Sequence, residues 1–288
     1  MASYELWRDR RGRLSALRIV ALGLLLFPVA KALVDAGAIA GGARPLNDVI
    51  HRTGFWALVF LGVTLAITPL RRIGRYGNLI DVRRMLGVGT FCYALAHILL
   101  YVADQSFDLI KVFTEITRRV YLIVGMIALT GLAALAITST DGMIKRIGGK
   151  RWRRLHQAIY VIALLALIHY FQQTKADLTV PVFVTGLFGW LIAYRILAWW
   201  QDKTELSTLS LLALSVIVAA LAFAGEAIGI AIEFGVSPLR VLATAFDFDA
   251  GIRPGWQVLA AGLAVVALDF VRARWNSRSA RPRPVAAQ

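Results

Sequence analysis

Residues 85–103 read MLGVGTFCYALAHILLYVA, an apolar run with no charged side chain and a single histidine, His97. With a rise of about 1.5 Å per residue, a helix of this length crosses the bilayer's hydrocarbon core, which is about 30 Å thick. Comparable runs cover residues 17–34, 49–68, 85–103, 119–137, 155–172, 181–200, 207–225 and 255–272. The sequence therefore predicts an all-α polytopic membrane protein with eight spans.

The overall composition supports a membrane protein. Hydrophobic residues make up 58% of the 288 residues, and the mean hydropathy is +0.66, whereas a soluble domain has about 45–50% apolar residues. A large soluble core would also need polar residues at helical spacing inside the runs, and these are mostly missing. The single cysteine, Cys92, lies within a span, so an intrachain disulfide and a cysteine-held iron–sulfur cluster are both excluded.

The net charge of +15 first suggests a nucleic-acid partner. The basic residues, however, lie in short segments between the spans, which is typical of Lys and Arg retained on the cytoplasmic side. No groove pattern of basic and stacking aromatic residues accompanies them. We therefore expect contact with membrane lipid and none with nucleic acid.

Counting charges loop by loop predicts the topology. Four segments, at 8–18, 71–84, 145–154 and 272–283, hold five or six Lys and Arg each. The intervening segments, at 35–48, 104–118 and 173–180, hold fewer and carry acidic residues. This alternation places both termini in the cytoplasm. Residues 226–254 then form an outer acidic loop, in which a short surface helix is possible.

All four histidines fall in or at the edge of spans: His51, His97, His156 and His169. Ionisable residues are costly inside a bilayer and usually mark function there. A single membrane histidine is more often a hydrogen bond between helices. Because all four histidines of this chain lie in or at the edge of spans, a functional role is the better explanation for them as a group.

Depth separates one pair from the others. His97 lies in the outer half of the third span and His169 near the outer end of the fifth, and both spans run outward. Two histidines at similar depth on parallel helices can clamp a heme iron from both faces. His51 begins the second span near the same surface, where an alternative axial ligand, a quinone contact and a structural hydrogen bond all stay open.

His156 lies alone at the inner surface, about 20 Å along the helix from His169. A second heme would need a partner for it about four turns before His97. Arg83 and Arg84 occupy those positions, and arginine cannot ligate iron. We therefore expect one heme, on the outer side.

What is left at the inner end is a basic cluster, formed by His156, Arg83, Arg84, Arg153 and Arg154. Such a group is suited to a phosphate or another anion, and hence to a flavin phosphate. For each arginine taken singly, ordinary anchoring on the cytoplasmic side is the favoured explanation.

Several segments together resemble the MsrQ family, also called YedZ, within the ferric-reductase-like transmembrane superfamily. They are RPLNDVIHRTG (44–54), TLAITPLRR (64–72), RRMLG (83–87), YALAH (93–97), TSTDGMIKRIGGKRWRRLHQAIY (138–160) and IHYFQQTKADL (168–178). The similarity covers about residues 10–200. Family histidines map onto His97, His156 and His169, and His51 lies in the first matching segment. Two-heme members of the superfamily carry two histidines on the third span, and this chain has only His97.

The resemblance implies a six-span heme-binding core, residues 1–206, with one b-type heme and FMN, in a bacterial inner membrane. Electrons would come from quinol or a cytoplasmic flavin reductase and pass to MsrP, a periplasmic molybdopterin enzyme that repairs oxidised methionine in proteins. The chain would then be the redox subunit of an oxidoreductase complex, without the terminal catalytic site.

Residues 207–288 depart from the family pattern, because they add two spans, the outer acidic loop and a basic tail. Two other functions stay open. A stand-alone transmembrane heme reductase of metal ions or quinone would need a nicotinamide or flavin domain, and no G-x-G-x-x-G strand–helix unit is present. A transporter with histidines as proton relays would bind no heme.

Overall fold

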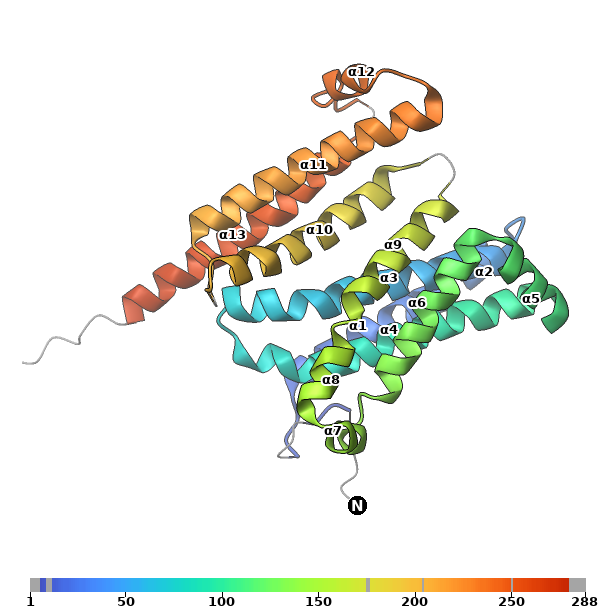
Figure 1. Ribbon diagram of the computed structural model, residues 1–288, viewed down its shortest axis with the longest axis horizontal. Helices are drawn as coiled ribbons and strands as arrows, with labels where there is room; N and C mark the ends of the chain where they lie inside the picture. Colours follow the sequence, from blue (N-terminus) through green and yellow to red (C-terminus); the bar gives the residue numbers. More distant parts are fainter. Residues whose placement is uncertain (1–5, 9–11, 175–176, 204, 250, 280–288) are drawn as a thin grey trace, which may run out of the picture. The chain divides into compact units, whose positions relative to one another are not determined.

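The computed structural model describes residues 6–8, 12–174, 177–203, 205–249 and 251–279. In this described part, all the regular elements are helices, joined by turns and loops, and there is no β-strand (Figure 1). Eight segments are long and apolar enough to cross a membrane, which confirms the predicted all-α, multi-pass architecture. They are α1 (Ala16–Val34), α3 (Pro45–Ile73), η1 with α4 (Gly77–Leu79 and Ile80–Asp104), α6 (Val120–Ile137), α8 with α9 (Gly149–His156 and Ile159–Gln173), α10 (Thr179–Trp200), α11 (Thr208–Phe234) and α13 (Pro254–Ser279).

Four short helices connect the spans: α2 (Ala36–Ala40), α5 (Leu109–Arg118), α7 (Asp141–Ile147) and α12 (Pro238–Ala243). The N-terminus of α5 is capped by Asp108, whose side chain accepts a hydrogen bond from the Lys111 backbone N–H. This helix is strongly amphipathic, and its apolar side chains Leu109, Ile110 and Phe113 are exposed, whereas Val112 is buried. Such a helix suits the bilayer surface.

Two predicted details need correction. The outer loop begins at Gly235 and not at 226, because α11 continues to Phe234 and ends at Gly235 in the left-handed conformation (φ +66°). Glu226 therefore lies inside α11, where it is 4% exposed and pairs with Arg253 at 3.0 Å. The predicted fifth span begins earlier and is interrupted at residues 157–158, between α8 and α9. The short helix expected in the outer loop is confirmed as α12.

The chain divides into two compact units. The first comprises residues 1–65 and 79–175, and in it α4 packs against α1 and α6, while α6 also packs against α5 and α9 (Figure 1). At the end of α1, Asp35 pairs with Lys31 and Arg52, each at 3.0 Å. Hydrogen bonds from Lys31 and then Arg52 hold the pKa of Asp35 below its usual value.

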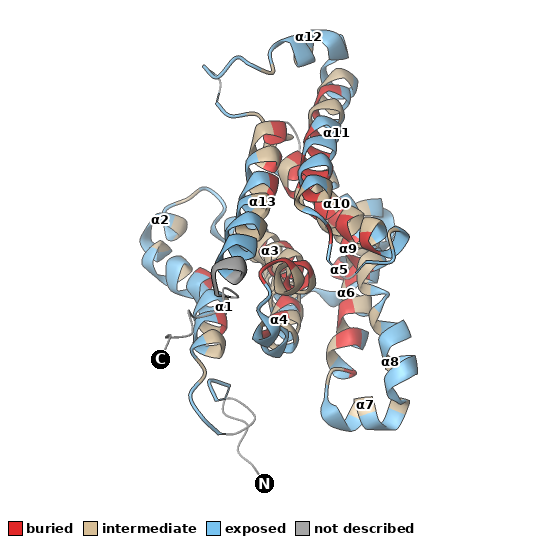
Figure 2. Cartoon of the chain, turned by 90° about the vertical axis from the view of Figure 1, so that its left-hand side faces the viewer, coloured by how far each residue is buried: buried red, intermediate tan, exposed pale blue. Residues whose placement is uncertain are grey.

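The second unit comprises residues 66–78 and 176–288, and α10, α11 and α13 pack side by side in it. Buried residues concentrate along α10 and α11 (Figure 2). Close approach depends on small residues: a Cβ on Gly262 would lie 2.5 Å from the Ser215 side chain. By its contacts, the sixth span thus groups with the last two. The resemblance to a six-span family predicts a different division, into residues 1–206 and 207–288. That division stays a prediction.

Candidate functional site

The structure brings together His97 on α4 and His169 on α9, the pair predicted from their depth. Their ring centroids are 6.2 Å apart, and the ring planes are inclined at 81°. Both side chains are half-buried within the first compact unit. Two helices that are distant in sequence therefore direct their imidazoles into one shared space.

Each of these rings is held by a backbone carbonyl of another helix. His97 Nδ1 lies 2.8 Å from the Ile50 carbonyl oxygen on α3, and His169 Nδ1 lies 2.8 Å from the Tyr121 carbonyl oxygen on α6. A carbonyl can only accept, so Nδ1 carries the proton in both rings. Each Nε2 then keeps its lone pair and is the nitrogen available to a metal.

A glycine makes each of these carbonyls accessible. Gly54 follows Ile50 by four residues, and a Cβ on it would lie 2.9 Å from His97 Nδ1. Gly125 follows Tyr121 by the same spacing, and a Cβ on it would lie 2.8 Å from His169 Nδ1. Residues four apart lie on one helix face, so any larger side chain would push the ring off its carbonyl. We call each carbonyl with its glycine a notch.

These notches cannot be recognised in the sequence. The only local signal is a glycine inside an apolar run, and the chain contains 24 glycines. Which glycine faces a histidine depends on the contact between α3 and α4, or between α6 and α9. Both contacts are tertiary.

The pair fits a heme iron. Metal–imidazole bonds of about 2 Å, with the ligating nitrogen about 1 Å from the ring centre, give a centroid separation of about 6 Å for two imidazoles on opposite sides of one ion. The observed 6.2 Å agrees with this value. No group of three or more His, Cys, Asp or Glu side chains that could hold a metal occurs in the described part of the chain. Two protein ligands suffice when a porphyrin supplies the others.

His51 lies on α3, near His97. Its side chain is exposed, and its Nδ1 lies 2.7 Å from the Asn47 carbonyl oxygen of the same helix. It is near enough to His97 for an electrostatic interaction. The bond to Asn47 leaves Nε2 as the nitrogen with a lone pair, so the three roles predicted for His51 stay open.

His156, in contrast, has a protein oxygen within hydrogen-bond distance of each ring nitrogen. Nδ1 lies 3.2 Å from the Trp152 carbonyl oxygen, and Nε2 lies 3.3 Å from Ser139 Oγ. The Trp152 ring also lies against the imidazole, with centroids 4.0 Å apart. His156 thus contacts its own helix and the end of α6, and a single heme stays a prediction.

The arginines of the predicted flavin site have different surroundings. Arg83 is half-buried and lies within electrostatic reach of His156. Arg84 pairs instead with Asp141 on α7, at 2.7 Å. Arg153 and Arg154 are exposed on the last turn of α8, the helix that ends at His156. Among the described residues, these four arginines have one carboxylate partner, Asp141, so positive charge is in excess at this end of the unit.

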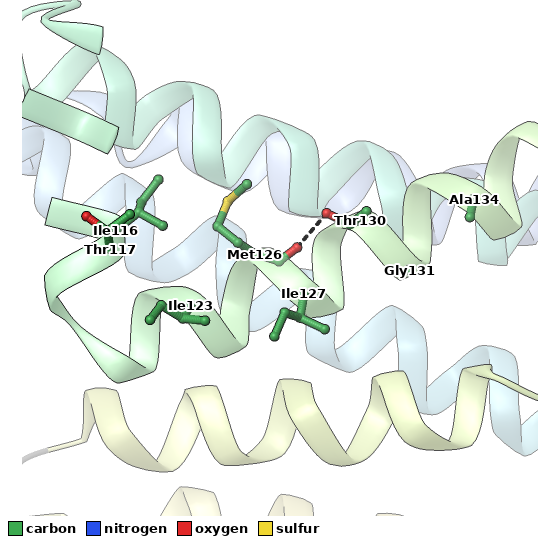
Figure 3. A pocket seen from close by; sticks show the side chains of 8 residues that line it. All are labelled: Ile116, Thr117, Ile123, Met126, Ile127, Thr130, Gly131 and Ala134. Atoms are coloured by element: carbon green, nitrogen blue, oxygen red, sulfur yellow. Dashed lines mark hydrogen bonds between the residues drawn. The ribbon is translucent and has the colours of Figure 1, made fainter. Parts of the chain in front are cut away.

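An apolar groove of about 700 Å³ runs along α6 in the same unit (Figure 3). Its lining residues are Ile116, Thr117, Ile123, Met126, Ile127, Thr130, Gly131 and Ala134. The hydroxyls of Thr117 and Thr130 donate to carbonyls of their own helices. The groove therefore suits a hydrocarbon chain better than a quinone ring, which needs polar groups to orient it.

Comparison with known proteins gives a consistent result. Residues 53–167 match the family described as ferric reductase like transmembrane component. A relative from Rhodospirillum rubrum is 38% identical over 192 residues, which cover 66% of this chain and 89% of that protein. One from Herminiimonas arsenicoxydans is 40% identical over 59% of this chain and 79% of its own length. Both are named protein-methionine-sulfoxide reductase heme-binding subunit MsrQ. No solved structure matches the chain.

Proposed function

The chain belongs to the MsrQ family of the ferric-reductase-like superfamily, and we propose that it is the heme-binding, electron-transferring membrane subunit of a methionine-sulfoxide reductase system. The observation that carries this proposal is the pair of imidazoles 6.2 Å apart, each with Nδ1 held by a carbonyl. His97 and His169 are the proposed axial ligands of one b-type heme.

The chain's own residues prepare the ligand pair in three ways. The carbonyls of Ile50 and Tyr121 select the tautomer in which Nε2 is unprotonated, and they raise the basicity of that nitrogen. The two notches hold both rings before a metal arrives, which lowers the ordering cost of binding. When bound, the heme supplies one-electron oxidation and reduction at iron, and two fixed imidazoles keep ligand rearrangement small.

We propose that electrons enter at the opposite end of the spans, from quinol or from a cytoplasmic flavin reductase through FMN. The flavin phosphate would lie against the basic cluster of Arg83, Arg84, Arg153, Arg154 and His156. The excess of guanidinium over carboxylate groups there supports an anion ligand. The groove along α6 lacks free polar groups, so it does not favour quinol binding at that place.

The proposed electron acceptor is a periplasmic, MsrP-like molybdopterin reductase. This proposal includes an inner-membrane location with both termini in the cytoplasm, as the charge alternation predicts. It also keeps residues 207–288 as an extension to the family core. The protein would act in the repair of oxidised periplasmic proteins without carrying the terminal catalytic site.

The test is a visible spectrum of purified full-length protein with His97→Ala and with His169→Ala, and His51→Ala tests the alternative axial ligand. We expect a b-type spectrum that either ligand substitution abolishes or converts to a weakly held, high-spin form. His51→Ala should keep the low-spin spectrum. A low-spin spectrum that survives both ligand substitutions would refute the assignment.

The heme-to-protein and FMN-to-protein ratios separate the two cofactor proposals. We expect one of each per chain. Replacing Arg83 and Arg84 together by Gln should release FMN while the heme ratio stays unchanged. Heme without FMN in the unsubstituted protein would leave the heme proposal intact and refute the flavin site.

A further inference from the structure

A second basic site lies in the other compact unit, where the end of α3 meets the loop between α10 and α11. It is a pocket of about 340 Å³. Its lining residues are Arg71, Arg72, Arg75, Gly77 and Glu205. All five belong to the second unit, whereas the proposed heme and flavin residues belong to the first. The electron-transfer scheme makes no use of this pocket.

The positive charge of this pocket is poorly compensated. Arg75 pairs with Glu205 at 3.2 Å, but both side chains are largely exposed, and such pairs are weak. Within the described residues, no carboxylate lies within ion-pair distance of Arg71 or Arg72, and both are partly buried. Adjacent guanidinium groups that share a pocket repel one another unless an anion joins them, so the pocket has the charge of an anion site.

Tyr194 gives a second, independent indication of a ligand. Its side chain is fully buried in α10, and among the described residues no acceptor takes its hydroxyl hydrogen. Arg72, which lines the pocket, lies within hydrogen-bonding reach of the hydroxyl oxygen, and Arg195 and Glu205 lie within electrostatic reach. Arginine can only donate, so neither neighbouring guanidinium can take the hydroxyl hydrogen. Buried donors are rarely left without an acceptor, and a ligand oxygen would provide one.

The depth of the pocket indicates what carries the anion. Trp199 and Trp200, at the end of α10 beside the loop that lines the pocket, are 81% and 76% exposed. Exposed tryptophans at span ends lie at the level of the lipid headgroups. Basic pockets between spans at this level bind the headgroups of anionic lipids.

We propose that this pocket binds the phosphate of an anionic phospholipid. Arg71 and Arg72 form charge-assisted hydrogen bonds to phosphate oxygens, a geometry that guanidinium groups favour. The Tyr194 hydroxyl donates to another oxygen, and Glu205 limits how much negative charge the pocket accepts. The proposal does not depend on the cofactor assignments.

The test uses the full chain in a neutral detergent, with native mass spectrometry to count bound lipids during titration with phosphatidylglycerol or phosphatidylcholine. We expect tighter retention of phosphatidylglycerol. The double variant Arg71→Gln/Arg72→Gln should weaken it about tenfold or more, since hydrogen bonds to charged groups are the strong ones. Lys145→Gln/Arg146→Gln removes the same charge from exposed positions in the other unit and should leave retention unchanged.

Two single substitutions separate this site from general surface charge. Tyr194→Phe keeps the net charge and the ring, and it should weaken phosphatidylglycerol binding several-fold without lowering the Tm. Glu205→Gln should strengthen binding. Tyr194→Phe that raises the Tm and leaves lipid retention unchanged would show that the hydroxyl is merely unsatisfied, and would overturn the site.

A competition with inorganic phosphate distinguishes the source of the anion. We expect millimolar phosphate to leave the bound phosphatidylglycerol in place, because the acyl chains add apolar contacts in the bilayer plane. Displacement at equal concentrations would mean that free phosphate is the ligand and would overturn the lipid assignment. Equal retention of phosphatidylcholine and phosphatidylglycerol would overturn the proposal as a whole.

Discussion

Gly54→Ala is the sharpest test of how the histidine pair is held. The added Cβ would lie 2.9 Å from His97 Nδ1 and 3.0 Å from its Cε1, whereas ordinary contact begins at 3.4 Å. The imidazole must therefore move by about 0.5 Å or rotate, and the 2.8 Å bond to Ile50 then exceeds the usual limit of about 3.2 Å. The ring loses the partner that fixes its tautomer.

The magnitude follows from that lost bond. A hydrogen bond of this kind contributes about 1 kcal/mol net, and the loss of outer-shell partners costs about 10- to 100-fold in metal affinity. We expect heme binding about tenfold weaker, together with a shifted midpoint potential. The helix itself should gain, because alanine in a helix interior is about 0.5–1 kcal/mol more favourable than glycine. A general folding defect would lower protein stability as well as heme affinity.

Heme transfer to excess apomyoglobin measures the dissociation rate, and a potentiometric titration gives the midpoint potential. Gly23→Ala in α1 is the matched control, because a Cβ at that position meets nothing within 4 Å. The notch interpretation is refuted if Gly54→Ala releases heme no faster than Gly23→Ala and keeps the wild-type potential.

Three further results are expected. Gly125→Ala should repeat the Gly54→Ala effect at the second notch, and a normal heme release rate there would confine the mechanism to α3. Arg253→Ala leaves Glu226 buried without its partner and should lower the free energy of unfolding by about 3 kcal/mol; an unchanged thermal unfolding profile in detergent would contradict this. Asp35 has a lowered pKa, so its contribution to stability is present above its usual value of 3.8 and is lost as the pH falls below it. Asp35→Asn should therefore flatten the dependence of Tm on pH between about 5 and 3.

The spans could be predicted from the sequence because a membrane helix is a local feature. Residues 85–103 are apolar for the full thickness of a bilayer, and no tertiary contact is needed to recognise them. The ends of the helices were less predictable. The charge of Glu226 predicts that the seventh span ends before it. Its pairing with Arg253 lets α11 continue past it.

For the candidate site, the histidine pair could be predicted from the sequence. The carbonyls and glycines that hold the two rings could not. His97 and His169 were selected by depth, which follows from the rise per residue and the direction of each span. The carbonyls that hold them lie 47 and 48 residues away in sequence. Every residue has a carbonyl and most spans contain a glycine, so no sequence pattern distinguishes Ile50 with Gly54 from other such combinations.

The sequence by itself determined that this is a multi-span helical membrane protein, with a pair of histidines at one depth and a basic cluster at the other end. These features depend on apolar length, charge placement and helical rise, all of which are properties of single segments. Only the tertiary structure decided that the two rings meet 6.2 Å apart and rest in matching notches. It also showed that Arg71 and Arg72 share a pocket. These results depend on how helices pack against one another, and a change of a few tenths of an ångström in packing decides whether a glycine is required.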